Sequence, residues 1–202
     1  MLKIENVHVD NIVRAVYAAR NAKNSWSRSD SLSLPDNTLG PNDLQLAKTL
    51  ANAGSDHGKF LRMINVTCDI TAPMYWIAEH DTYKVGTVRN SCSFMHKGVS
   101  KPFELADFTI EHNADEEKAL ANIVEILNCW RNKYLETKDF EYFRMIRQTL
   151  PQGYNIRYTW QANYAVLKNI YHARKDHRLS EWNEFCAWIK TLPYAKELII
   201  GE

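Results

Sequence analysis

The sequence lacks the features that identify several large classes of protein. It has only seven glycines, and no Gly-x-Gly-x-x-Gly motif or P-loop, which excludes nucleotide binding through a glycine-rich turn. The 25 basic residues balance the 24 acidic ones without a basic block, so no binding to a nucleic-acid polymer is expected. No apolar run approaches the roughly 20 residues that cross a bilayer. We therefore expect a protein without a membrane segment.

The cysteines and the N-terminus favour a reducing compartment. The four cysteines are widely spaced and form no Cys-x-x-Cys pair, which indicates reduced thiols. The first ten residues alternate in polarity and carry acids, unlike a signal peptide. These two observations predict a cytoplasmic protein.

What is present indicates a folded chain of one domain. Hydrophobic residues make up 45% of the sequence and aromatic residues 11%, which is typical of a globular protein. The hydrophobic periodicity predicts a mixture of strands and helices, without a repeat or a linker. We predict one α+β domain over residues 1–202, with strands at 2–9 and 61–71 and helices at 11–21, 41–53, 74–81, 115–136, 139–149, 163–174 and 180–191. Ile64, Val66, Cys68 and Ile70 are expected on one face of the second strand, and acidic residues in the first turn mark the start of the 115–136 helix. Asn11 and Ser180 are expected to cap their helices, and the last helix is expected to turn Trp182, Phe185, Cys186 and Ile189 inward. Residues 25–40 are polar and serine-rich, which predicts a mobile loop. Residues 157–159 are expected to be extended, and residues 82–99 irregular or extended.

The most informative stretch runs from Arg147 to Arg174. On a helix, Asn163, Leu167, Ile170 and Arg174 fall on one stripe about 16 Å long. Because Leu and Ile on a stripe face a core, the Asn and Arg at its ends need partners there. One interpretation is a wall that binds an anionic, hydrogen-bonding ligand. The other is that these polar side chains bond the backbone or reach solvent.

The same stretch resembles the flavin-dependent thymidylate synthases. That family shows Ala-Arg-x-x-Leu-Pro, then aromatic residues, then Asn-x-Arg-x-Leu-x-x-Phe-x-x-x-Arg. Here the corresponding residues are Ile146-Arg-Gln-Thr-Leu-Pro151 and, further on, Asn163 to Arg174. The resemblance implies a small antiparallel sheet with packed helices, and a homotetramer with sites between subunits.

The resemblance also assigns roles to individual residues. Arg147 and Arg174 match positions that contact the deoxyuridylate substrate, and a guanidinium suits both a phosphate and the edge of a pyrimidine. Asn163 and Asn169 match positions that face the flavin. His57, in Gly54-Ser-Asp-His-Gly-Lys-Phe60, matches a histidine beside the flavin.

The family's second signature, Gln-x-x-Arg-His-Arg-x-x-Ser-x-Asn-Glu-x-Ser-x-Arg-Tyr, is rewritten in this chain. In the same register its Arg-His-Arg is Thr82-Tyr-Lys84, its nucleotide-contacting Ser is Cys92, and its phosphate-facing Arg is Phe94. We assign Lys84 to the flavin side, and Cys92 to the substrate side as a possible nucleophile if its pKa is lowered. A small buried cysteine in a packed turn is the alternative for Cys92. Two further residues are assigned to the substrate, namely Glu79 and Arg89.

The resemblance implies an enzyme that transfers a one-carbon unit from methylene-tetrahydrofolate to C5 of a pyrimidine deoxynucleotide, with FAD as cofactor. Arg174 and Cys92 are the candidate catalytic residues. Because the second signature is rewritten, a modified pyrimidine nucleotide or hydroxymethyl transfer is also consistent. The alternative is a flavin-free homologue that binds a nucleotide or plays a structural role. A metal site at His172, Asp176 and His177, or at His80 with Asp81, has little support because no His-Glu-x-x-His motif occurs.

Overall fold

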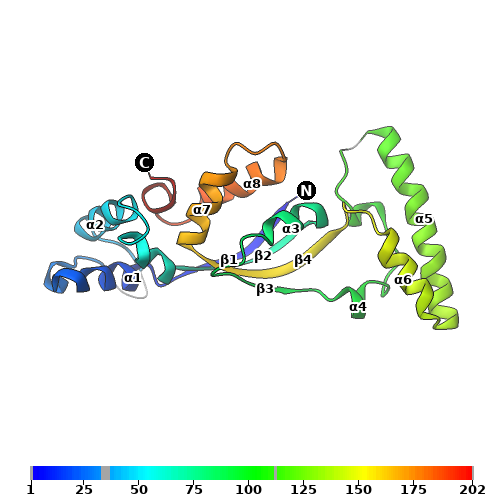
Figure 1. Cartoon of the computed structure of the whole chain (residues 1–202), viewed down its shortest axis with the longest axis horizontal. Helices are drawn as coiled ribbons and strands as arrows, with labels where there is room; N and C mark the ends of the chain where they lie inside the picture. The colour runs from blue at the N-terminus through cyan, green and yellow to red at the C-terminus, as the bar shows by residue number, and fades with distance from the viewer. Residues whose placement is uncertain (1, 33–36, 112, 202) are drawn as a thin grey trace. The chain divides into compact units, whose positions relative to one another are not determined.

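The structure is a computed structural model that describes residues 2–32, 37–111 and 113–201 (Figure 1). Four strands form one antiparallel sheet in the order β1-β2-β4-β3. They are β1 (Lys3–Asp10), β2 (Asn65–Pro73), β3 (Val88–Ser91) and β4 (Asn155–Asn163). The helices are α1 (Ile12–Ala19), α2 (Pro41–Ala51), α3 (Met74–His80), α4 (Phe94–Lys97), α5 (Ala114–Thr137), α6 (Phe140–Thr149), α7 (Tyr164–Arg174) and α8 (Ser180–Ile189), with a π-turn at Lys196–Ile200. The predicted α+β class and antiparallel sheet are confirmed.

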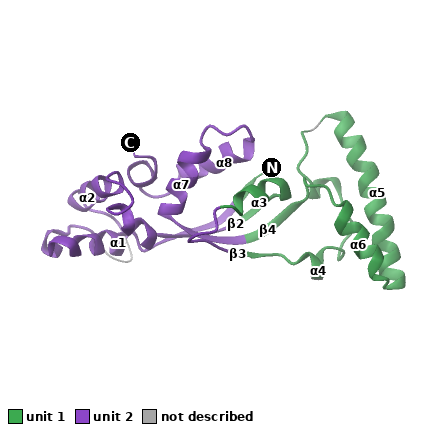
Figure 2. Ribbon diagram, in the orientation of Figure 1, with its two compact units in different colours: residues 1–3, 70–82, 90–158 green, residues 4–69, 83–89, 159–202 purple. Residues whose placement is uncertain are grey.

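The chain forms two compact units, coloured separately in Figure 2. Unit 1 comprises residues 1–3, 70–82 and 90–158, and unit 2 comprises residues 4–69, 83–89 and 159–202. All four strands have residues in both units. No helix in the described ranges is both long and apolar enough to cross a membrane.

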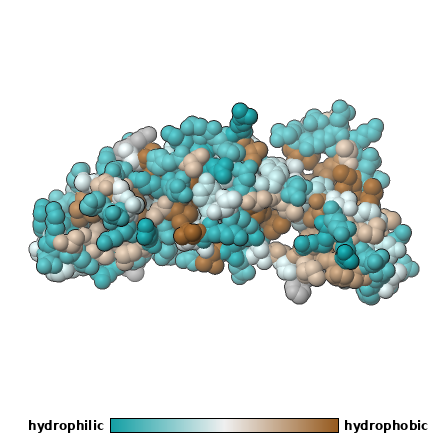
Figure 3. Space-filling view, in the orientation of Figure 1, coloured by the Kyte–Doolittle hydropathy of each residue, from teal (hydrophilic) through white to brown (hydrophobic). Residues whose placement is uncertain are grey.

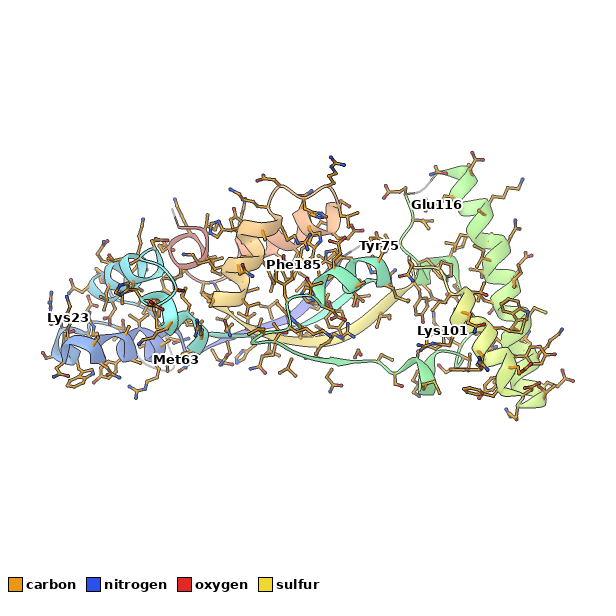
Figure 4. The ribbon with its side chains drawn as sticks, viewed as in Figure 1. Lys23, Met63, Tyr75, Lys101, Glu116 and Phe185 are labelled. Carbon is orange, nitrogen blue, oxygen red and sulfur yellow. The ribbon has the colours of Figure 1, made fainter. Side chains whose placement is uncertain are left out.

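In the described residues of unit 2, helices α1, α2, α7 and α8 are accompanied by short helical turns. Helix α7 contacts α8, the 3-10 turn Gly58–Met63 and the π-turn, and α2 contacts the π-turn. The two apolar residues of the predicted stripe on α7, Leu167 and Ile170, are fully buried. Phe185 of α8 meets Trp160 of β4 with ring centroids 5.9 Å apart, and Figure 4 shows its side chain among those between α8 and the sheet. The predicted inward face of α8 is therefore confirmed.

Unit 1 is built on the long helix α5, which packs against α6. Its core consists of aromatic and aliphatic side chains from the 103–108 segment, α5 and α6, namely Phe103, Phe108, Leu120, Leu127 and Ile146. Figure 3 shows hydrophobic residues gathered along α5 on the face in view. The acidic first turn of α5 and the cap from Asn113, whose side chain accepts from the backbone N–H of Glu116, explain where this helix begins.

Several predicted boundaries are wrong. The strand predicted from residue 61 begins at Asn65, because residues 58–63 form a 3-10 turn, although Val66, Cys68 and Ile70 are buried as expected. The extended segment predicted at 157–159 is the nine-residue strand β4. The segment predicted as irregular or extended, 82–99, contains the strand β3, which agrees with the prediction, and the short helix α4, which does not.

Two predicted helix caps are also wrong. Asn11 has a φ of 72° and makes no side-chain cap, since its amide donates to the carbonyl of Met63 at 2.9 Å. Ser180 is the first residue of α8, and the cap position is Leu179.

The described part of the 25–40 segment is tied to α2 by a buried charge. Asp43 of α2 is 1% exposed and receives hydrogen bonds from the hydroxyls of Ser29 and Ser31. The Nε of Arg20, which is 5% exposed, donates to Asp43 at 2.6 Å. Residues 33–36 of the predicted mobile loop lie outside the described residues. The mobility of the loop stays a prediction.

Candidate functional site

A cavity of about 540 Å³ in unit 2 brings together two segments that the sequence separates by more than a hundred residues. One wall belongs to α7 and includes Ala165 and Asn169. The facing wall belongs to the segment after α2 and includes Ser55, Gly58 and Arg62. The complete lining is Ala51, Asn52, Gly54, Ser55, Gly58, Leu61, Arg62, Ala165, Lys168, Asn169, His172, Ile200 and Gly201.

Two residues on the α7 side of this cavity are held by hydrogen bonds to neighbouring backbone. The ammonium of Lys168 donates to the carbonyl of Ala51 at 2.7 Å and to the side-chain oxygen of Asn52 at 3.2 Å. Burial lowers the pKa of Lys168 below its ordinary value. Nε2 of His172 lies 3.1 Å from the carbonyl of Ile199, an interaction in which a protonated Nε2 donates. These bonds fix the wall of the cavity around the exposed amide of Asn169.

The polar groups of the cavity suit an anionic ligand with a hydrogen-bonding ring. Asn169 offers an amide donor and acceptor, Ser55 offers a hydroxyl, and Arg62 and Lys168 bring positive charge. None of the described lining residues is acidic. His57 is exposed and lies beside Gly58, a lining residue. The structure therefore brings the predicted residue Asn169 into one site with the segment that carries His57.

Sequence reasoning did not single out Lys168 or Arg62 as residues of this site. Lys168 follows Leu167 in an apolar stretch of α7, where a lysine is typical of a helix surface. The sequence signal that could have indicated Lys168 is its position next to Asn169, since both side chains line the same wall of the cavity. Arg62 lies in the 3-10 turn Gly58–Met63, where the sequence predicts the start of a strand.

Asn163 does not belong to the α7 stripe as predicted. It is the residue before α7, with a φ of −123°, and its side-chain oxygen accepts from the backbone N–H of Val166 at 3.1 Å. A β-carbon added to Gly86 would lie only 3.0 Å from the side-chain amide nitrogen of Asn163. Gly86 has a φ of +79°, so both its conformation and its close approach to Asn163 favour glycine. Asn163 therefore caps α7 and supports the 83–87 loop.

The same loop contacts the other end of α7 through Tyr83. The hydroxyl of Tyr83 accepts from Nε of Arg174 at 2.8 Å. The Arg174 guanidinium carbon also lies 4.7 Å from the ring centroid of the buried Trp182 and 5.6 Å from that of Tyr83. The cation is thus held by two aromatic rings and one hydroxyl. Lys84, beside Tyr83, is exposed.

The predicted substrate residues divide between the units. Arg147 is an exposed residue of α6 in unit 1, with its guanidinium carbon 5.1 Å from the ring centroid of Phe94. Phe94 borders a small cavity of unit 1 that Cys92 also lines. Cys92 is exposed, so the alternative of a buried structural cysteine is wrong. The remaining two, half-buried Glu79 in unit 1 and exposed Arg89 in unit 2, belong to α3 and β3.

The cavity around α1 and the buried histidine of α3 contain none of the predicted site residues. A cavity of about 1050 Å³ lies around α1, and its lining includes Asn37. His80 is a buried residue that stacks on Trp76 with centroids 4.7 Å apart, and its Nδ1 lies 3.2 Å from the hydroxyl of Tyr158. Within the described ranges, no group of three or more His, Cys, Asp or Glu residues could hold a metal ion.

No family model matches the sequence, and no curated protein matches it significantly. Among solved structures, the chain is similar to thymidylate synthase X from Helicobacter pylori with FAD and dUMP, with a TM-score of 0.73, 18% identity, and coverage of 98% of this chain and 97% of that one. A second structure of the Helicobacter pylori flavin-dependent enzyme, complexed with FAD and dUMP, gives a TM-score of 0.72 at 18% identity, with the same coverage.

A third similar structure is the UMP/dUMP methylase PolB from Streptomyces cacaoi bound with 5-Br dUMP. Its TM-score is 0.68 at 14% identity, over 99% of this chain and 95% of that one. These likenesses show that the chain has the fold of the flavin-dependent thymidylate synthases. The predicted resemblance is confirmed at the level of the fold.

Proposed function

We propose that this chain, on the fold of the flavin-dependent thymidylate synthases, is a flavin-dependent one-carbon transferase that acts on C5 of a pyrimidine nucleotide. The observation that carries the proposal is the 540 Å³ cavity of unit 2. The resemblance assigned Asn169 and the segment around His57 to the flavin from two separate motifs. Both segments contribute to the walls of this one cavity.

The cavity fits part of a flavin dinucleotide. Its volume lies within the range of about 300–1000 Å³ that is common for small-molecule sites. In the proposal, Asn169 bonds the flavin ring, while Arg62 and Lys168 lie near its phosphates. His57 and Lys84 lie on exposed segments that can add contacts. The bound flavin supplies the redox chemistry, and the protein orients the pyrimidine.

The nucleotide side of the proposal rests on Arg174, Arg147 and the residues around them. Tyr83 and Trp182 hold the side chain of Arg174. Its guanidinium is therefore preorganised and loses less conformational entropy when a ligand binds. Methylene-tetrahydrofolate as donor and a homotetramer as the assembly are parts of the proposal that follow from the resemblance. The neighbour PolB, described as a UMP/dUMP methylase, favours a nucleotide monophosphate as substrate.

A product assay tests this function directly. Protein supplied with FAD, a reductant, dUMP and methylene-tetrahydrofolate is expected to yield a C5-substituted nucleotide. Arg174→Ala is expected to lower the turnover at least tenfold, because it removes the cation fixed between Tyr83 and Trp182. Arg178→Ala, an exposed residue four positions after α7 ends, is the matched control and should leave turnover unchanged. Equal turnover in the Arg174 variant contradicts the assigned role.

One observation favours a second function, a flavin-free protein that binds a nucleotide. In this chain, Tyr83 bonds Arg174, and the 83–87 loop packs on α7 through Gly86. A loop used for internal packing has less capacity to bind a flavin. A colourless protein that still binds dUMP in a calorimeter would support this alternative over the first.

A further inference from the structure

The guanidinium of Arg174 lies against two aromatic rings of unit 2, those of Tyr83 and Trp182. The two rings stand edge to face, with centroids 6.0 Å apart and planes at 72° to each other. Trp182 is completely buried, so the core of unit 2 fixes the position of its ring. Tyr83 is half-buried, and it supplies both the second ring and the hydroxyl that accepts from Nε of Arg174. The orientation of Arg174 therefore depends on a residue of the 83–87 loop as well as on the core.

The loop that carries Tyr83 is closed by its own hydrogen bonds and lies on α7. The hydroxyl of Thr87 donates to the carbonyl of Tyr83 at 2.9 Å, and the backbone N–H of Thr87 donates to the carbonyl of Lys84 at 3.3 Å. A β-carbon added to Gly86 would lie 3.3 Å from the side chain of Val166, so the loop directly contacts the first turn of α7. The backbone of Tyr83 therefore has a defined position relative to the helix that ends at Arg174.

The contacts of Tyr83 separate it from the cavity that we assign to the flavin. The resemblance assigns the position of Tyr83 to a flavin contact. Neither Tyr83 nor Arg174, however, is among the described residues that line the 540 Å³ cavity of unit 2. The hydroxyl of Tyr83 bonds Arg174, which the proposed function places on the nucleotide side. A change at Tyr83 should therefore affect the nucleotide more than the flavin.

We infer that Tyr83 is a positioning residue for the nucleotide, on which it acts through Arg174. Because a guanidinium is planar, an acceptor on Nε and a ring on its face together define the plane in which it lies. A guanidinium held in one orientation loses less conformational entropy when it binds a phosphate or the edge of a pyrimidine. This inference rests on the proposed function, since that function assigns Arg174 to the nucleotide.

Two substitutions separate the hydroxyl of Tyr83 from its ring. Tyr83→Phe keeps the ring but removes the acceptor, and Tyr83→Leu removes both. The full chain is incubated with FAD and desalted, absorbance measures the retained flavin, and calorimetry measures the Kd of dUMP. Tyr17→Phe and Tyr17→Leu are the matched controls. Tyr17 is also half-buried in unit 2, and the guanidinium carbon of Arg14 lies 5.2 Å from its ring centroid.

Tyr83→Phe is expected to raise the Kd of dUMP about five- to tenfold, because it removes a hydrogen bond to a charged group, and Tyr83→Leu should raise it further. Flavin retention should be unchanged in both variants, and the Tyr17 variants should bind dUMP as the unmodified protein does. In turnover assays, the KM for dUMP should rise while kcat changes less than about twofold, a split that a loss of folded protein does not produce. When Arg174 is already alanine, Tyr83→Phe should cause no further loss, since the two residues act together.

Four results would overturn the inference. They are no binding of dUMP by the unmodified protein, unchanged binding in Tyr83→Phe, an equal loss of binding in the Tyr17 variants, or a loss of flavin in Tyr83→Phe as large as the loss of dUMP. The last would return Tyr83 to the flavin contact that the resemblance assigns. Failure of the flavin chemistry alone gives a different pattern, with no retained flavin and no C5-substituted product but weaker dUMP binding in both Tyr83 variants. If urea unfolding shows that Tyr83→Leu does not fold, Tyr83→Phe decides the outcome.

Discussion

Replacing Ala165 by Phe is expected to lower flavin retention at least tenfold. Ala165 lies on α7 and lines the 540 Å³ cavity, so a benzyl group there occupies space that the flavin requires. The position is half-buried on a helix surface, so the larger side chain is tolerated in the free protein. The readout is the ratio of flavin absorbance to protein absorbance after incubation with excess FAD and desalting.

Ala187→Phe provides the matched control for this substitution. Ala187 is an exposed residue of α8 in the same unit, and it does not line the cavity. It introduces the same side chain into the same type of element, so general effects of an added aromatic residue cancel. If both variants retain flavin as the unmodified protein does, the cavity is not the flavin site.

Breaking the buried pair of Arg20 and Asp43 is expected to lower the free energy of unfolding by about 3–5 kcal/mol. Both side chains are almost fully buried, so removing one leaves an uncompensated charge in the interior. Asp43→Ala also removes the acceptor for Ser29 and Ser31, which tie the preceding loop to α2. Urea unfolding measures the effect. Lys101→Ala, in the exposed pair with Asp107, is the control and should cost less than about 1 kcal/mol.

The contribution of Asp43 to the free energy of unfolding should decrease as the pH falls. Burial raises the pKa of Asp43, but hydrogen bonds from Ser29, Ser31 and Arg20, together with the charge of Arg20, outweigh it and hold the pKa below its ordinary value of 3.8. A carboxyl group with a lowered folded pKa stabilises the protein above its unfolded pKa. The gap between the unmodified protein and Asp43→Asn should therefore be constant above about pH 5 and narrow as the pH falls below 3.8. A gap that widens in acid would contradict this account.

Helices and the clearest strand were predictable because their hydrophobic periods are regular. The alternation of Val66, Cys68 and Ile70 predicted the buried face of β2, and the acidic first turn predicted the start of α5. The sequence predicted an extended segment only at residues 157–159, whereas β4 runs from Asn155 to Asn163. Its length comes from pairing with β2 and β3, which is a tertiary effect that local pattern does not contain.

The site was predictable only in part, for reasons that individual residues show. The resemblance predicts that Asn169 faces a flavin, and in the structure Asn169 lines the 540 Å³ cavity of unit 2. Asn163 was misplaced into the helix because an Asn at the first turn and an Asn at the cap look alike in sequence, and only the backbone φ separates them. The partners of Arg174, Tyr83 and Trp182, come from a loop and another helix, so no local pattern indicates them.

The rewritten second signature has a physical consequence in the structure. At a position that the resemblance assigns to a flavin contact, the Tyr83 hydroxyl accepts a hydrogen bond from Nε of Arg174. At the position that the resemblance assigns to a phosphate-facing Arg, the ring of Phe94 packs against Tyr154 and lies under the guanidinium of Arg147. In this chain both residues therefore make internal contacts.

The visible absorption spectrum of the purified protein, before and after incubation with excess FAD and desalting, tests the central claim most directly. The account predicts a retained flavin band, and predicts that Asn169→Ala weakens it while Asn122→Ala, an exposed residue of α5, does not. A protein that stays colourless after incubation with FAD would contradict the assignment of the α7 cavity to a flavin. In that case, the flavin-free nucleotide-binding function would replace it.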